Sequence, residues 1–131
     1  MVLRVASHLM FEGRASEALE LYSSVFPEFR VDRIERYAEG GPGAAGTVMR
    51  ADITFGQHDL VIIDSPVHHA FTFTASMSLF VDFDSEASLG AAFRILSDGG
   101  QVFMPIANYG FSRQFGWCSD RFGVSWQLNL P

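Results

Sequence analysis

The sequence predicts an α+β fold in which a βαβββ module occurs twice within 131 residues. Three observations lead to this prediction. The order of predicted elements in the first half returns in the second half. The tripeptide Ser16-Glu17-Ala18, at the start of the first predicted helix, returns 69 residues later as Ser85-Glu86-Ala87. Apolar residues make up 48% of the chain, enough for a substantial core. We expect a single domain, 1–131, with modules at about 3–66 and 70–131.

The first half contains one predicted helix among four predicted strands. Residues 5–11 are rich in apolar and β-branched types and form the first strand. Apolar residues at helical spacing then continue until Pro27 ends the helix. Residues 31–37 form a weaker strand, and the glycine-rich stretch 38–46 is a loop. Strands resume at 47–55 and 59–64, with a hairpin turn at 56–58.

The second half follows the same order. Residues 71–81 alternate between apolar and polar types and predict one long strand. Asp84 is the expected N-cap of the second helix, which ends at Gly99-Gly100. Its apolar face consists of Leu89, Ala92, Phe93 and Leu96. Strands follow at 101–107, 113–118 and 122–130.

A hollow between the strands follows from this arrangement. Each helix covers one face of its own strands, so we expect the opposite faces to curl into a cupped mixed sheet with the helices outside. A lining of mixed polarity is typical of a small-molecule pocket. The side chains expected to point into the cup are Leu60, Ile62, Asp64, Ser76, Ser78, Phe80, Ser125, Gln127 and Asn129.

Composition excludes several classes of function. The net charge is −6, with nine arginines and no lysine, which disfavours binding to nucleic acids or anionic membranes. A single cysteine, Cys118, excludes an intramolecular disulfide framework and a cysteine-based zinc site. No stretch has the length of a signal or membrane-spanning segment, so we expect a cytoplasmic protein.

Several titratable and polar side chains have two interpretations each. His8 is either a ligand or general base in the cup, or a residue of the strand surface or the dimer interface. Asp64 is either a pocket acid or an aspartate that caps a turn. Gln127 is better explained as a hydrogen-bonding group of the pocket than as a core residue. We expect the other histidines to lie on the surface: His58, His68 and His69.

The sequence does not support nucleotide binding or serine-hydrolase chemistry. Gly41–Gly46 satisfies G-x-G-x-x-G, but a predicted strand follows where a helix is required. No S-adenosylmethionine-binding pattern and no G-x-S-x-G elbow is present. Cys118 is expected to be a buried, unreactive thiol, while Phe80 or Trp117 can stack on an aromatic ligand.

The chain resembles PhnB-like proteins of the glyoxalase/bleomycin-resistance/dioxygenase (vicinal oxygen chelate) superfamily. The resemblance rests on the opening helix, residues 11–27, on Leu60–Pro66, and above all on the closing block Gly116–Gln127. It implies paired βαβββ modules in a cupped sheet and a homodimer. Members have often carried the label 3-demethylubiquinone-9 3-methyltransferase, a chemistry that nothing in this sequence supports.

The resemblance also implies where a divalent metal would bind in metal-dependent relatives. The ligand positions fall on Ser7 with His8 beside it, on or near Ile62 with Asp64 two residues on, on Ser76, and on Gln127. This set cannot hold a transition metal firmly, because such sites rely on His, Cys and carboxylate ligands. We therefore predict no metal and no other cofactor.

The function predicted from these observations is binding of an unidentified small molecule in a non-metal pocket. Its lining would comprise Ser7, His8, Ile62, Asp64, Ser76, Ser78, Phe80 and Gln127. One alternative is a metal-dependent lyase, transferase or dioxygenase that uses His8 and Asp64. Another is a non-catalytic regulatory module that binds a partner. Whether the protein is an enzyme is left open.

Overall fold

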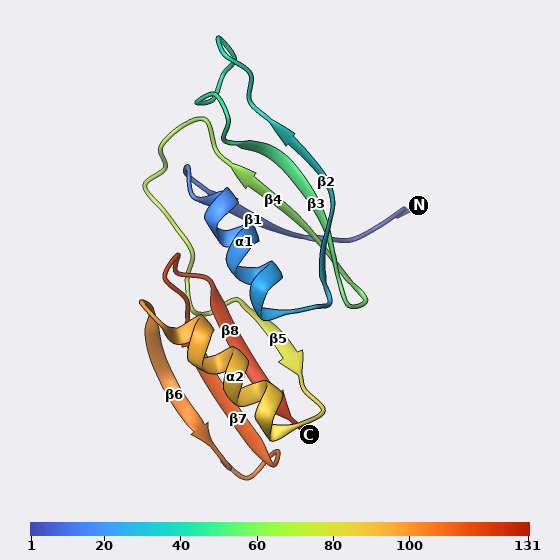
Figure 1. Ribbon diagram of the computed structural model, residues 1–131, viewed down its shortest axis with the longest axis vertical. Helices are drawn as coiled ribbons and strands as arrows, with labels where there is room; N and C mark the ends of the chain where they lie inside the picture. The colour runs from blue at the N-terminus through green and yellow to red at the C-terminus, as the bar shows by residue number, and fades with distance from the viewer. The chain divides into compact units, whose positions relative to one another are not determined.

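The computed structural model describes residues 1–131 and divides into two compact units, Met1–Thr72 and Phe73–Pro131. Each unit contains one helix and one four-stranded sheet (Figure 1). The chain therefore has the predicted α+β class. The union of the two sheets into one cup, and the single domain, stay predictions.

The first unit has the element order βαβββ. Its elements are β1 (Ser7–Phe11), α1 (Ala15–Val25), β2 (Phe29–Arg36), β3 (Val48–Phe55) and β4 (His58–Asp64). The strands lie in the order β1-β4-β3-β2, with β1 parallel to β4 and the other pairs antiparallel. The crossover through α1 gives the sheet its single parallel pair.

The second unit repeats this topology. Its elements are β5 (Ser78–Asp82), α2 (Glu86–Ser97), β6 (Gln101–Ala107), β7 (Gln114–Ser119) and β8 (Ser125–Leu130). The strand order is β5-β8-β7-β6, and the only parallel pair is again the first strand with the last. The predicted duplication is therefore confirmed at the level of topology.

The tripeptide that suggested the duplication is not in structural register. An offset of 69 would match Phe11, which is 4% exposed, with Phe80, which is 57% exposed. Ser16 lies inside α1, whereas Ser85 precedes α2 as its N-cap. The two helices begin 71 residues apart, at Ala15 and Glu86. The Ser-Glu-Ala echo is therefore coincidental, although the conclusion drawn from it is correct.

Both helices bury the predicted apolar faces. The buried residues of α1 are Ala15, Ala18, Leu19 and Tyr22, and those of α2 are Leu89, Ala92, Phe93 and Leu96. Both sets have the same spacing of three, one and three residues, which aligns one stripe on a helix of 3.6 residues per turn. No helix of the structure has the length and apolarity needed to cross a membrane.

Three predicted elements are wrong in their bounds. The long strand 71–81 is reduced to β5, because residues 75–77 form a turn. The predicted N-cap Asp84 is replaced by Ser85, whose side chain accepts a hydrogen bond from the amide of Ser88. The last strand begins at Ser125 rather than 122, because residues 120–124 form a tight turn closed by backbone hydrogen bonds.

Each sheet has a helix side and an open side, and the strand register assigns residues to them. Residues directly paired on neighbouring strands point to the same side. In the first sheet Ile62 is fully buried and pairs with Leu9, so both lie on the helix side. The open side carries His8 and Met10, together with their partners Val61 and Ile63 on β4.

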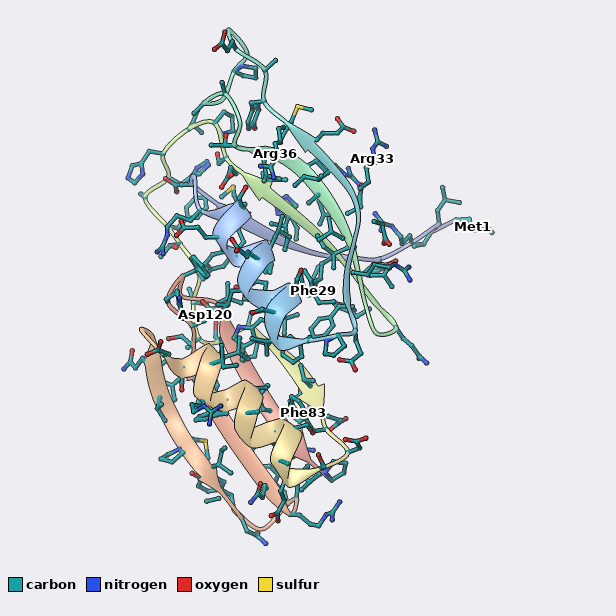
Figure 2. The ribbon with its side chains drawn as sticks, viewed as in Figure 1. Met1, Phe29, Arg33, Arg36, Phe83 and Asp120 are labelled. Atoms are coloured by element: carbon teal, nitrogen blue, oxygen red, sulfur yellow. The ribbon has the colours of Figure 1, made fainter.

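Strands β2 and β3 of the first sheet carry ion pairs between solvent-accessible side chains. Arg33 pairs with Glu35 on β2, and Arg50 pairs with Asp52 at 2.9 Å on β3. The partner of Asp52 on β4 is Val61, which places these charges on the open side of the sheet. Figure 2 shows Arg33 at the outer edge of this unit. The opposite charges on these two strands pair with one another.

Candidate binding face of the second sheet

The open side of the second sheet carries three rows of side chains across β5, β8 and β7. The opposite side lies under α2, because a Cβ atom added at Gly116 would meet the Phe93 ring at 2.7 Å. Register places nine residues on the open side, and we call them the open face. The rows are Ser78–Ser125–Ser119, Phe80–Gln127–Trp117 and Asp82–Asn129–Phe115.

The first row anchors a hydrogen-bond network. The Oγ atoms of Ser78 and Ser125 are 2.6 Å apart, and the indole Nε1 of Trp117 donates to Ser125 Oγ at 2.9 Å. Ser125 is 1% exposed, so its hydroxyl is satisfied inside the protein. The network fixes the orientation of the Trp117 ring against the sheet.

The second row places an amide between two aromatic rings. The Nε2 of Gln127 donates to Ser78 Oγ at 3.1 Å, which fixes the direction of the amide. No other hydrogen bond holds this side chain, so its Oε1 is free to accept from outside the protein. Phe80 is 57% exposed, an unusual fraction for so large an apolar ring.

The third row joins a loop that contributes two aromatic rings. The rings of Phe111 and Phe115 lie 5.0 Å apart, and those of Tyr109 and Phe115 lie 6.2 Å apart. Phe80 approaches the same ring at 6.3 Å. Residues 108–113, between β6 and β7, thus extend the open face with aromatic side chains. The hydroxyl of Tyr109 donates to the carbonyl of Pro105 at 2.6 Å.

Three predicted site residues meet on this face. Ser78, Phe80 and Gln127 lie in adjacent rows, and the predicted inward orientation of Ser125 and Asn129 agrees with the register. His8 belongs to the other unit, where it is exposed on the open side of the first sheet. Its role as a pocket residue stays a prediction.

The orientation predicted for Leu60, Ile62 and Asp64 is wrong. All three are at most 1% exposed and lie on the helix side of the first sheet. Ser7 pairs with Leu60 and therefore also lies on the helix side, where its Oγ is 2.9 Å from Nε2 of His58. Strand β4 is apolar on both sides, so its sequence gave no signal for the choice.

Asp64 caps α1 rather than serving as a pocket acid. Its Oδ1 accepts from the amides of Gly13 at 2.7 Å and Ala15 at 3.0 Å, and its Oδ2 accepts from Val48 at 2.9 Å. The positive end of the helix dipole adds to the stabilisation of this carboxylate. The second interpretation of Asp64, as a capping residue, is therefore correct, although Asp64 caps a helix and not a turn.

Ser76 is also misplaced by the prediction. It lies in the turn before β5, outside the sheet, and its hydroxyl is 2.9 Å from that of Thr74. The alternation across 71–81 suggested a strand, but the turn at 75–77 interrupts it. The serine that occupies the sheet is Ser78.

The surface histidines form local hydrogen bonds. The Nδ1 of His68 lies 2.7 Å from Glu12 Oε1, and this hydrogen bond lowers the pKa of the Glu12 carboxyl. His69 is half-buried, with Nε2 2.8 Å from Ser65 Oγ. His58 and His68 are exposed, as predicted.

The residues at the metal-ligand positions do not fit a divalent metal. Ser7 and Ile62 face α1, Ser76 lies outside the sheet, and Gln127 donates its amide proton to Ser78. The structure contains no group of three or more His, Cys, Asp or Glu side chains placed to hold an ion. The alternative pair, His8 and Asp64, fails because Asp64 is occupied by three backbone amides.

Cys118 lies on β7 under the helix and is fully buried. Burial is the main cause that raises the pKa of its thiol to about 12, and the charge of Asp120 adds to the shift. At pH 8 the thiol is therefore protonated and inaccessible. We expect iodoacetamide to leave Cys118 unmodified in the native chain while it alkylates the urea-denatured chain fully, as measured by mass spectrometry.

A matched variant tests this interpretation of Cys118. Ser119 is the next residue along β7 but points to the open face, and it is half-exposed. In the native S119C variant we expect alkylation at position 119 only. Labelling of Cys118 at the rate of the denatured chain would contradict the burial that the structure shows.

The glycine-rich loop does not form a phosphate-binding site. Strand β3 begins two residues after Gly46, as the sequence predicted, so no helix N-terminus faces the loop. A Cβ atom added at Gly43 would lie 2.6 Å from the Tyr37 ring. Gly43 therefore allows the loop to pack closely on Tyr37.

The aromatic loop residues Tyr109 and Phe111 are site residues that the sequence did not predict. They fall in a segment without periodicity, Asn108–Ser112, where neither strand nor helix spacing marks a functional side. Two aromatic residues so close together in a short loop were the one available signal. Asp82 and Phe115 were also missed, because the register of β5 and β7 was not known.

The chain has the glyoxalase/bleomycin-resistance-like α+β fold. A glyoxylase/bleomycin resistance protein/dioxygenase domain from Frankia sp. EAN1pec shares the fold, with a TM-score of 0.67 at 12% identity, and the match covers 99% of this chain and 93% of that chain. No curated protein matches the sequence.

A family model and structures of higher sequence identity show the family to which the chain belongs. The model of the 3-demethylubiquinone-9 3-methyltransferase family matches residues 4–129. A putative 3-demethylubiquinone-9 3-methyltransferase, PhnB protein, from Bacillus cereus is 44% identical, with a TM-score of 0.93, and the match covers 98% of this chain and 99% of that chain. Protein PA1353 from Pseudomonas aeruginosa is 26% identical, with a TM-score of 0.82 and 98% coverage of both chains. The chain belongs to this PhnB-like family.

Proposed function

We propose that this protein binds a small aromatic molecule on the open face of the second sheet. The observation that carries the proposal is the second row, in which the Gln127 amide lies between Phe80 and Trp117. Aromatic rings with a small number of fixed polar groups are the usual composition of a ligand site. The ring of the ligand would stack on Phe80 or Trp117, and its donor group would reach Oε1 of Gln127.

The hydrogen-bond network supports this role for Gln127. Ser78 holds Nε2 of the amide, so Oε1 is presented as an acceptor without further ordering when a ligand binds. Ser78 in turn contacts Ser125, which also accepts from Trp117. The network therefore links the stacking ring to the polar group, and both are placed before the ligand arrives.

The proposal assigns binding and no bond-making step. The first two rows offer hydroxyls, an amide and aromatic rings, and none of these is a strong general base at neutral pH. The family's methyltransferase label is not adopted, since the sequence contains no pattern for binding S-adenosylmethionine. A calorimetric titration with that cofactor is the direct check of the label.

The test measures binding of neutral indole to variants of this face. We expect indole titrated by NMR to shift the Trp117 indole resonance, and Gln127→Leu to weaken binding about five- to tenfold, the equivalent of about 1 kcal/mol for one hydrogen bond. Phe80→Ala should weaken it by a similar factor through lost stacking.

The matched control for Phe80→Ala is Phe71→Ala. Phe71 is 64% exposed and lies in the first unit, stacked on His69 at 4.9 Å, so it resembles Phe80 in exposure but not in location. Equal loss in both variants, or no effect of Gln127→Leu, would refute the proposed site. Melting temperatures of all variants show whether the fold is retained.

We also propose that the protein is a cytoplasmic homodimer. The support for the dimer is that each sheet has two edge strands with a neighbour on one side only, β1 and β2 in the first sheet and β5 and β6 in the second. Such edges are usually covered. Light scattering across a range of protein concentrations tests the dimer, and a monomeric mass throughout would refute it.

A further inference from the structure

A buried acceptor in the third row of the open face has no partner. Asn129 is 8% exposed, and its Nδ2 donates to Oδ1 of Asp82 at 2.8 Å. Its Oδ1 is buried and receives no hydrogen bond. An orphaned acceptor of this kind costs about 1–3 kcal/mol in a folded protein. Such a group in a native structure points to a donor that binds there.

The surroundings of Asn129 combine a negative charge with aromatic rings. Asp82 on one side is exposed and forms no ion pair, while Phe115 on the other side is the centre of the ring cluster with Phe80, Tyr109 and Phe111. A carboxylate and an amide oxygen both accept hydrogen bonds, and the faces of aromatic rings attract cations. The third row is therefore complementary to a positively charged donor.

We propose that the third row binds a protonated amine, so that the ligand class is an aromatic ring joined to a primary ammonium group. The ammonium would donate to Asn129 Oδ1 and to Asp82, and the ring would lie on the second row beside Gln127. This inference rests on the proposed function, because it names the ligand class of the same face.

The spacing of the rows sets the length of that ligand. The second and third rows are two residues apart along the strands, a distance of about 7 Å. A chain of two carbons between ring and ammonium spans much of this distance, whereas an amine attached directly to the ring does not. The inference therefore favours arylethylamines over anilines.

The test compares three probes that share an indole ring. Tryptamine carries an ammonium, tryptophol carries a neutral hydroxyl at the same place, and indole-3-propionate carries a carboxylate. By calorimetry with the full chain, we expect tryptamine to bind at least tenfold more tightly than tryptophol, and the carboxylate to bind most weakly. Equal affinity for tryptamine and tryptophol would overturn the inference.

Variants assign the preference to the third row. Asp82→Asn removes the charge from an exposed residue and is expected to reduce the tryptamine preference to about twofold or less. Asn129→Leu removes the orphaned acceptor, so it should weaken tryptamine binding without lowering the melting temperature. A preference that persists at tenfold in Asp82→Asn would show that another group binds the amine and would overturn the inference.

The results also separate this inference from the proposed function. Binding of all three probes with equal affinity, lost in Gln127→Leu, would refute the ammonium site and leave the aromatic site intact. If none of the three probes bound, both the ammonium site and the proposed aromatic site would be refuted. Phe71→Ala serves again as the control, with all three affinities expected to be unchanged.

Discussion

Replacing Asp64 with alanine is expected to lower the free energy of unfolding by about 4 kcal/mol, a large part of the roughly 5–15 kcal/mol that stabilises an ordinary folded chain. The carboxylate accepts three backbone hydrogen bonds, from Gly13, Ala15 and Val48. Its loss would leave the amides of Ala15 and Val48 buried and unpaired, and would remove the negative charge from the N-terminus of α1. Urea denaturation followed by circular dichroism measures the effect.

The control for Asp64 is Asp59, which lies on the same strand. Asp59 faces the opposite side of β4 and forms a partly exposed ion pair with Arg4 at 3.6 Å. Because exposed ion pairs contribute about 0–1 kcal/mol, Asp59→Ala should change stability by no more than that. If both variants were equally stable, the role of Asp64 as the cap of α1 would be wrong.

Changing Gly100 to alanine is expected to destabilise the second unit by about 3 kcal/mol. A Cβ atom at this position would lie 2.0 Å from the carbonyl oxygen of Ser119 and 2.9 Å from the Cα of Asp120. Both contacts are with backbone, so relief requires the β6–β7 pairing to shift. The measurement is the midpoint of thermal unfolding, with tryptophan fluorescence as the signal, since both tryptophans lie in this unit.

The control is the same substitution at Gly90, where alanine is expected to stabilise the protein. It lies within α2, and a Cβ atom there would have no neighbour within 4 Å. Alanine is favoured over glycine in a helix by about 1 kcal/mol, so Gly90→Ala should raise the unfolding midpoint. Destabilisation by both substitutions, or by neither, would contradict the packing of Gly100 against the turn.

The element order and the helix faces could be predicted because they depend on local signals. Apolar spacing fixed the buried stripes of α1 and α2, and Pro27 and Gly99 marked where the helices end. The closing strand β8 alternates cleanly, so Gln127 was assigned to the correct side. These features need no knowledge of which strands pair.

The side of a strand could not be predicted where both sides are apolar. Strand β4 reads His-Asp-Leu-Val-Ile-Ile-Asp, and a shift of one residue exchanges its two sides. The deciding contact is between Asp64 and the amide of Val48, which are 16 residues apart in the chain. A single sequence does not reveal such a contact, so Ile62 and Asp64 were assigned to the wrong side.

The aromatic part of the candidate site was missed for a different reason. Tyr109 and Phe111 occupy a loop, where side-chain direction depends on tertiary packing rather than on periodicity. Their contacts with Phe115 become visible only in the folded unit. The same is true of Asn129, whose unpaired oxygen is defined by its burial.

The contrast between the two open sides suggests a division of labour between the repeats. The first carries charges on β2 and β3 that neutralise one another, whereas the second carries rings, hydroxyls and an unpaired amide oxygen. Efforts to retarget this scaffold toward new compounds should therefore vary the three rows of the second repeat. The first repeat can be kept unchanged as a framework, with its aspartate-capped helix intact.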